Sequence, residues 1–191
     1  MKKEKILKKF GQNTEIYTFN DTVAVLERAW AQKCGLGFIG KSSMFIHRKF
    51  GTYTFLGGFV TNLNLLLDNN CEKNYCGSCN VCLINCPTGA IVESRKIDAR
   101  RCLTTWNVER ISSMKKKDHF KLKGYGWAFG CDICQEVCPW NKFKKKTMEL
   151  RFQPNHNHVV LGLKSVPFNL CGTSFSRSKM DGLLKSIKLS F

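Results

Sequence analysis

CGSCNVCLINCPTGAI, residues 76–91, holds four cysteines separated by two, two and three residues, with a proline after the last. Three cysteines in one tight loop can bind three corners of a cubane 4Fe–4S cluster. In two-cluster proteins the fourth cysteine, the one before the proline, binds the other cluster. This run therefore predicts an iron–sulfur module whose remaining ligands come from elsewhere in the chain.

A second run supplies those ligands. It holds Cys131, Cys134 and Cys138, again with a proline after the last cysteine, and Cys102 stands alone between the two runs. If each run gives its proline-flanked cysteine to the other cluster, eight ligands serve two clusters and no site is left incomplete. The spacing predicts one cluster on Cys76, Cys79, Cys82 and Cys138, and another on Cys86, Cys102, Cys131 and Cys134.

Two other uses of clustered cysteines fit less well. Zinc sites usually pair two C-x2-C knuckles some distance apart, which a run of four cysteines ending in proline does not resemble. Disulfides belong to oxidising compartments, and the N-terminus MKKEKILKKF lacks the apolar stretch of a secretory signal. Three cysteines are left over and are expected to be small core or surface residues: Cys34, Cys71 and Cys171.

The bulk composition predicts a folded cytoplasmic protein of one domain or two small ones. The chain has 191 residues, of which 43% are hydrophobic. No segment approaches the roughly 20 apolar residues of a membrane span, so no membrane partner is expected. The formal charge of +17 favours a polyanionic partner, with nucleic acid first and an anionic membrane surface second. A basic protein without such a partner is the plainer alternative.

Local patterns predict a few elements outside the module. A helix is expected from Asn20, with Asn20 or Asp21 as its cap and Gly35 as its end. GLGFIGKSS, residues 35–43, permits close backbone approach to a ligand, although a plain tight turn explains it equally well. Residues 52–67 read as a buried strand or hairpin. A short helix is expected over 173–187, capped by Thr173 or Ser174.

Several blocks resemble the epoxyqueuosine reductases, including one block that a cluster-only protein would not need, DTVAVLERAWAQKCGLGFIGKSS at 21–43. The resemblance runs over roughly residues 17–188. Its other blocks are CGSCNVCLINCPTGAI at 76–91, IDARRCLTTW at 97–106, GCDICQEVCPWN at 130–141, FQPN at 152–155 and GTSFSRSKMDGLLKSIK at 172–188.

The resemblance implies a cytoplasmic enzyme that reduces epoxyqueuosine to queuosine in tRNA. An external donor would pass single electrons through two 4Fe–4S clusters to a cobalamin, and the anticodon loop of tRNA would be the partner of a monomeric chain. It implies that Asp21 is the proton donor, and that cobalamin is approached by Lys41, Ser42 and Thr104. Without the resemblance, Asp21 is better explained as a helix N-cap than as a proton donor, and Lys41 as a solvated surface lysine.

Two departures from the family pattern bear on these expectations. Ala24 stands where the family commonly has proline, which should alter only the start of the helix. The family is also longer, and most of the additional length precedes Asp21. We therefore expect a C-terminal portion that binds cobalamin weakly and shows little turnover alone. The alternatives are a stand-alone 4Fe–4S electron-transfer protein and a basic nucleic-acid-binding module with a structural metal.

The predicted fold class is α+β. Residues 1–68 are expected to be the remnant of an α/β cobalamin-type domain, 69–146 a two-cluster ferredoxin-like module, and 147–191 a tail with a short helix. Lysine runs at 115–117 and 142–146, with Arg100 and Arg101, could bind phosphates. Three tryptophans could stack on unpaired bases or pack against the clusters: Trp106, Trp127 and Trp140.

Overall fold

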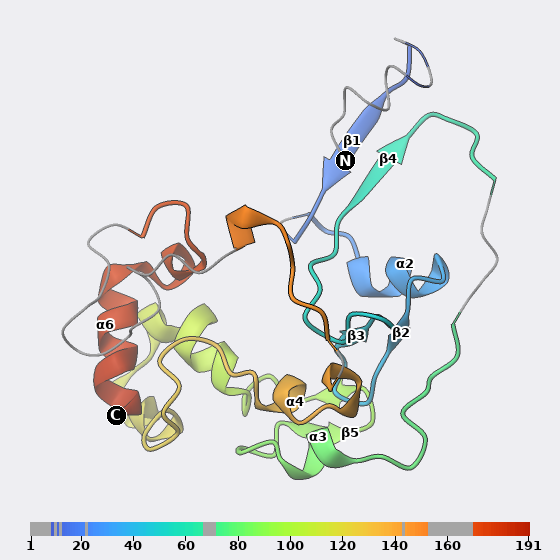
Figure 1. Ribbon diagram of the computed structural model, residues 1–191. Coiled ribbons are helices and arrows are strands. Elements are labelled where there is room, and N and C mark those ends of the chain that lie inside the picture. The colour runs from blue at the N-terminus through green and yellow to red at the C-terminus, as the bar shows by residue number, and fades with distance from the viewer. Residues whose placement is uncertain are drawn as a thin grey trace.

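The computed structural model describes residues 9, 11, 13–21, 23–66, 72–142, 144–152 and 170–191. Figure 1 shows three regions: a projecting pair of strands, a central group of short elements, and the C-terminal helix α6 beside the segment before it. The predicted mixture of helices and strands is confirmed. In the part of the chain described, no helix is long and apolar enough to cross a membrane.

The N-terminal region consists of one helix and two small antiparallel sheets. Strand β1 (Ile16–Phe19) pairs with β4 (Gly58–Thr61), and β2 (Phe38–Ile39) pairs with β3 (Phe45–Ile46). Of the buried strand or hairpin expected over 52–67, the described residues form a strand, β4, which has no buried residue and pairs with a segment about 40 residues earlier, so the hairpin alternative is wrong. Helix α2 (Glu27–Lys33) lies between β1 and β2 in the sequence.

Helix α2 begins later than predicted and has a different cap. Its N-cap is Leu26, which has no side-chain capping bond, so neither Asn20 nor Asp21 caps it. Asp21 has a φ of 52°, in the left-handed region that a right-handed helix cannot contain. The predicted end is confirmed, because Cys34 is the C-cap and Gly35 follows with a φ of 69°.

The cysteine-rich region is built from short elements, as expected of a module whose core is partly inorganic. It contains α3 (Val81–Ile84), β5 (Ile91–Glu93), β6 (Lys96–Ile97), α4 (Ile133–Glu136) and the 3-10 turn η4 (Pro139–Asn141). Strands β5 and β6 pair as an antiparallel hairpin, and α3 contacts α4.

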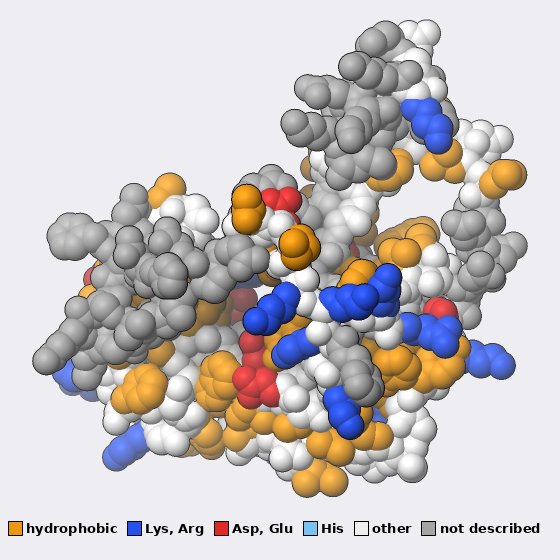
Figure 2. All heavy atoms as spheres, viewed as in Figure 1, with side chains coloured by type: hydrophobic (Ala, Val, Ile, Leu, Met, Phe, Trp, Pro, Cys, Tyr) orange, Lys and Arg blue, Asp and Glu red, His pale blue; other side chains and the backbone are white. Residues whose placement is uncertain are grey.

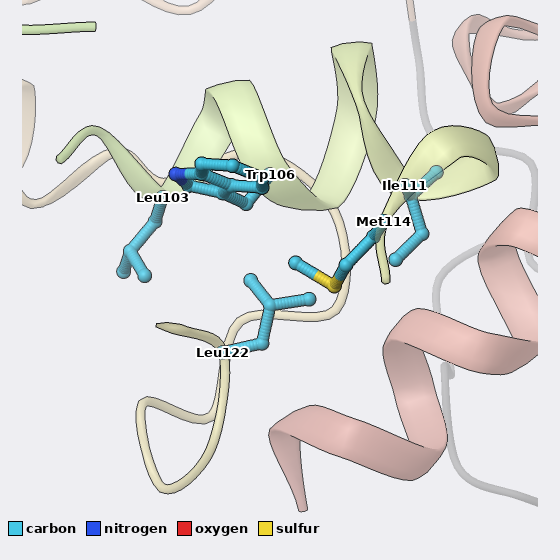
Figure 3. Packing of buried hydrophobic residues seen from close by; sticks show 5 residues of the cluster. All are labelled: Leu103, Trp106, Ile111, Met114 and Leu122. Atoms are coloured by element: carbon cyan, nitrogen blue, oxygen red, sulfur yellow. The ribbon is translucent and has the colours of Figure 1, made fainter. Parts of the chain in front are cut away.

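The C-terminal region supplies most of the conventional hydrophobic core. It contains the π-helical η1 (Thr105–Glu109), the 3-10 helices η2 (Ile111–Ser113), η3 (Lys116–Lys121) and η6 (Ser174–Ser178), and helix α6 (Lys179–Ser190). The 3-10 turn η5 (Leu150–Phe152) instead contacts the N-terminal region, where Phe152 packs on Phe55. The helix expected over 173–187 is thus a 3-10 turn followed by α6. Figure 3 shows one buried cluster beneath η1 and η2: Leu103, Trp106, Ile111, Met114 and Leu122.

Asn107 connects this core to the second cysteine run. Its side chain is fully buried, and its Nδ2 donates to the carbonyls of Trp127 (2.9 Å) and Gly130 (2.8 Å). The Gly130 N–H donates back to Asn107 Oδ1 at 3.1 Å. These three bonds position the backbone immediately before Cys131.

We expect Asn107→Ala to destabilise the protein by about 3 kcal/mol, because it leaves the partly buried carbonyl and N–H of Gly130 without these partners and removes one of the two hydrogen bonds to the Trp127 carbonyl. The midpoint of thermal unfolding of the iron-loaded protein should fall by about 10 °C. The exposed residue Asn64 provides the matched control, since Asn64→Ala should change stability by less than about 0.5 kcal/mol. Equal midpoints for the two variants would contradict this role of Asn107.

Candidate metal centre

The first cysteine cavity is lined by Cys76, Cys79, Cys82 and Cys138, and has a volume of about 130 Å³. The first three come from the turn that leads into α3 and from α3 itself, and Cys138 comes from the end of the second run. The rest of the lining consists of Lys41, Ser42, Ile46, Tyr75, Pro139 and Trp140. The structure therefore brings together the four thiols that the spacing grouped, with residues of the N-terminal region beside them.

The second cysteine cavity is lined by Cys86, Cys102, Cys131 and Cys134, and has a volume of about 50 Å³. All its other lining residues come from 87–103, and they are Pro87, Thr88, Ala90, Ile91, Ile97 and Leu103. Cys102, which is alone in the sequence, lies between β6 and η1 and so reaches the second run.

The two runs form matching structures. In each, the cysteine before the proline-flanked one lies in a four-residue helix, Cys82 in α3 and Cys134 in α4. The proline-flanked cysteine follows the end of the helix and lines the cavity of the other run: Cys86 lines the second cavity, and Cys138 lines the first. Because α3 and α4 pack together, this exchange places the two cavities next to each other. Neighbouring centres of this kind suit the transfer of single electrons.

The thiols affect one another within these groups. Burial, followed by the charges of Cys131, Cys102 and Cys86, raises the pKa of Cys134 to about 12. Burial and then Cys76 raise the pKa of Cys82. For Cys86, burial acts upward, but backbone N–H groups of Ile91, Thr88 and Ala90 outweigh it and lower the pKa. Bound iron would take the place of the thiol protons.

The geometry also bears on the zinc alternative. Four thiolates on one zinc ion lie within about 4 Å of each other, given a Zn–S bond of about 2.3 Å in a tetrahedron. Among the described residues, no group of three or more His, Cys, Asp or Glu side chains is placed to hold a single metal ion. Two sets of four thiols, each lining one cavity, match the number of cysteine ligands that two cubane clusters need.

The GLGFIGKSS segment approaches the first cysteine cavity closely. A Cβ at Gly40 would lie 2.6 Å from Ile46 Cδ1 and 3.5 Å from Cys76 Sγ, so a larger residue would press on the ligand loop. Lys41 Nζ donates to Asn80 Oδ1 at 2.8 Å, and Asn80 lies between Cys79 and Cys82. Ser42 is buried. The segment is thus a contact surface for the cluster loop, which its sequence alone left undecided.

Asn141 attaches the second run to the N-terminal region. The Thr52 N–H donates to Asn141 Oδ1 at 2.8 Å, and Asn141 Nδ2 donates to Thr52 Oγ1 at 2.8 Å. Gly51 has a φ of 74°, and a Cβ there would lie 2.0 Å from Asn141 Oδ1. Glycine is therefore required for this close approach.

Asp21 lies at the edge of a separate hollow of about 620 Å³, which we call the Asp21 hollow. Its lining comprises Asn20, Asp21, Glu27, Arg28, Thr54, Phe55, Leu56 and Phe152. The side chain of Asp21 is 72% exposed. Lys41 and Ser42 line the first cysteine cavity instead, and Thr104 immediately precedes η1.

Arg177 joins three regions of the chain. Its Nη1 lies 3.3 Å from Asp21 Oδ2, and its Nε lies 3.1 Å from Glu109 Oε1 in η1. Sequence reasoning missed Arg177, as it missed Phe55 and Phe152 in the Asp21 hollow. These contacts join residues up to 156 positions apart, and no local spacing indicates them.

The basic residues form an exposed surface beside the clusters. Lys144, Lys145 and Lys146 are exposed, and Lys144 Nζ lies 4.4 Å from the centre of the Tyr53 ring. Figure 2 shows Lys and Arg side chains across the middle of one face, with a smaller acidic patch beside them. Trp106 is only 7% exposed, so the packing alternative is confirmed for it and base stacking is wrong.

Comparison with known proteins agrees with this geometry. Residues 75–141 match the family described as a 4Fe–4S double cluster binding domain, which makes iron–sulfur clusters the cofactors of this module. Curated relatives are named epoxyqueuosine reductase. The protein from Atelocyanobacterium thalassa is 38% identical over 190 residues, which is 98% of this chain and 61% of the relative. That from Cyclobacterium marinum is 42% identical over 137 residues, 72% of this chain and 44% of the relative.

Solved structures show the same likeness. A selenomethionine-labelled epoxyqueuosine reductase superposes with a TM-score of 0.83 at 25% identity, over 98% of this chain and 51% of that one. An epoxyqueuosine reductase with an epoxyqueuosine-modified tRNA-Tyr stem loop gives 0.80 at 25% identity, over 98% and 51%. The chain spans 61% or less of the length of these relatives. In sequence and in structure, the chain is similar to the C-terminal part of the epoxyqueuosine reductases.

Proposed function

We propose that this chain serves the reduction of epoxyqueuosine to queuosine in tRNA, as the part that carries electrons to the reaction. The observation that carries the proposal is the pair of neighbouring four-cysteine cavities, the first of which borders the N-terminal region that holds Asp21. The likeness to epoxyqueuosine reductases supplies the reaction. The functional division follows 1–68, 69–146 and 147–191, with the clusters in the middle segment.

Each cavity holds one 4Fe–4S cluster in this proposal. Cys76, Cys79, Cys82 and Cys138 bind the first cluster, and Cys86, Cys102, Cys131 and Cys134 bind the second. Support comes from the number and type of donors and from the agreement between the spacing and the two cavities. An external one-electron donor reduces the clusters in the cytoplasm, and the chain acts as a monomer.

The Asp21 hollow fits one side of a cobalamin. A macrocycle needs apolar surface against its face, and the hollow offers Phe55, Leu56 and Phe152, with Phe55 87% and Phe152 58% exposed. When bound, cobalamin supplies the reducing cobalt centre that the residues of this chain cannot provide. Lys41 and Ser42, which line the first cysteine cavity, would lie between this cofactor and the first cluster. Thr104 remains a proposed contact from the family resemblance.

Asp21 is the proposed proton donor to the oxygen of the opened epoxide. Its carboxyl group lies at the edge of the hollow, where a substrate can reach it, and Arg177 fixes its orientation through a contact of 3.3 Å. Arg177 in turn is held by Glu109. This chain would therefore orient a proton source at the same cavity toward which the clusters deliver electrons.

Product formation tests the proposal directly. The iron-loaded chain, with cobalamin and a chemical reductant, would be incubated with an epoxyqueuosine-containing tRNA stem loop. It would be assayed alone and fused to the N-terminal part of a relative, and nucleosides would be measured by mass spectrometry. We expect queuosine from the fusion and much less from the chain alone. Absence of queuosine from a fusion that retains both clusters would contradict the proposed reaction.

The exposed lysines should bind the phosphates of the tRNA. We expect replacement of Lys144, Lys145 and Lys146 by glutamine to weaken binding, because each phosphate contact releases counterions. The slope of log affinity against log salt should become shallower by about 2 to 3 for three lost contacts. Binding of a labelled stem loop, measured over a range of salt concentrations, gives this slope.

A second triple variant removes the same charge elsewhere. Lys123, Lys179 and Lys188 are exposed on or near α6, and replacing them by glutamine should change the slope much less. Equal effects of the two variants would mean that net charge alone governs binding, and would contradict a defined phosphate-binding surface.

A further inference from the structure

The two cysteine cavities differ in their charge. Lys41 is the one charged side chain that lines the first cysteine cavity, and among described residues no charged side chain lines the second. The lining of the second cavity is mainly aliphatic. It includes Ala90, Ile91 and Leu103, and all three are buried. A cluster gains one negative charge when it is reduced, so a nearby cation favours the reduced form and an apolar surrounding disfavours it.

Lys41 is held in place beside the first cavity. Its Nζ donates to Asn80 Oδ1 at 2.8 Å, and the Arg95 N–H donates to the Lys41 carbonyl at 2.8 Å. Asn80 belongs to the loop that carries Cys79 and Cys82. The ammonium group is therefore tied to the ligand loop itself, and it carries no carboxylate partner in the contacts of the described residues.

Other charges near the second cavity do not reverse the difference. Arg100 and Arg101 precede Cys102, but both pair with Asp98, and their side chains are 84% and 58% exposed. Asp132, next to Cys131 in the chain, places a negative charge on that side of the second cavity. The Ala90 N–H donates to Cys86 Sγ at 3.2 Å, which favours reduction of the second cluster, but as a dipole rather than a full charge.

We propose that Lys41 raises the reduction potential of the first cluster above that of the second, so that electrons run from the second cluster to the first. The first cavity is the one that borders the N-terminal region, through Lys41, Ser42 and Ile46. The direction rests on the proposed function, because it leads toward the Asp21 hollow. The potential difference itself requires only the two clusters.

The expected size follows from Coulomb's law. At an effective dielectric constant of about 20, a unit charge anywhere within about 12 Å shifts an equilibrium by at least about tenfold, and Lys41 lines the first cavity itself. Removing the Lys41 charge should therefore lower the equilibrium constant for reducing the first cluster by about tenfold, which is about 59 mV for a one-electron couple. Lys41 acts here through its positive charge on the first cluster and does not contact the substrate.

Redox titration of the iron-loaded chain, followed by electron paramagnetic resonance, tests this. Two redox couples are expected, one for each cluster. Lys41→Met should lower the equilibrium constant for reduction of the higher-potential couple by about tenfold and should change the lower-potential couple less. Lys41→Arg keeps the charge and should keep both potentials. Lys33→Met is the matched control. Lys33 lies in α2, where its ammonium group contacts the Trp30 ring and lines neither cysteine cavity, so removing its charge should leave both potentials unchanged.

Cys102→Ala provides the independent assignment, since it removes a proposed ligand of the second cluster alone. The couple that survives should be the higher one. Survival of the lower couple would overturn the direction, and unchanged potentials in Lys41→Met would overturn the role of Lys41. None of these readouts requires queuosine formation, so failure of the proposed reaction would leave this test intact.

Discussion

Replacing Cys102 by alanine should remove one cluster and leave the other. Cys102 completes the second cysteine cavity, and the other described cysteines outside the two sets, Cys34 and Cys171, are exposed elsewhere. Among the described cysteines, no spare thiol is therefore placed to take its position. Iron should fall from about eight to about four atoms per chain, with a matching loss of sulfide.

Iron and sulfide analysis after anaerobic reconstitution measures this effect. Cys34→Ala is the matched control, because it also removes one cysteine and should keep about eight irons. Full iron content in Cys102→Ala would contradict the assignment of this residue. Loss of iron from the first cysteine set, with retention by the second, would contradict the proposed exchange of ligands between the two runs.

Asp21→Asn should reduce queuosine formation by at least about a hundredfold, because it removes a proton donor but keeps the size of the side chain. The variant would be made in the fusion that carries the N-terminal part of a relative. Arg177 and Glu109 should keep the loop in place, since an amide oxygen can still accept from Arg177. Iron content and the unfolding midpoint should not change.

Asp181→Asn tests whether any lost carboxylate has this effect. Asp181 is exposed in the first turn of α6 and takes no part in the Asp21 hollow. Its replacement should leave turnover unchanged. Normal queuosine formation by Asp21→Asn would mean that another group supplies the proton, and would remove Asp21 from the proposed mechanism.

The grouping of the cysteines could be predicted because it depends on local spacing. Two runs with a proline-flanked cysteine, together with Cys102, leave one arrangement that uses all eight ligands, and the structure gathers the same two sets. The end of α2 at Gly35 was also predictable, since glycine favours the left-handed backbone found there.

The remaining features depend on contacts between distant segments. The pairing of β1 with β4 and the contact of Arg177 with Asp21 join residues that no local pattern relates. The predicted start of α2 was wrong because aspartate is a common N-cap residue, whereas the backbone of Asp21 has a left-handed conformation. Its exposure could not be predicted either, because burial is a property of the packed chain.

Lys41 illustrates the same limit. A lysine after a glycine-rich turn is usually a solvated surface residue, and only its hydrogen bond to Asn80 shows that it belongs to the cluster loop. The short elements around the cysteines also have little hydrophobic core between them. We therefore expect cluster assembly and folding of this region to be coupled.

Mössbauer spectroscopy of the chain reconstituted with iron-57 and sulfide, combined with metal analysis, tests the presence of two cubane clusters most directly. We predict about eight irons per chain, all in 4Fe–4S clusters, with negligible zinc. About one zinc per cysteine set without iron, or a single cluster of about four irons, would contradict the two-cluster account.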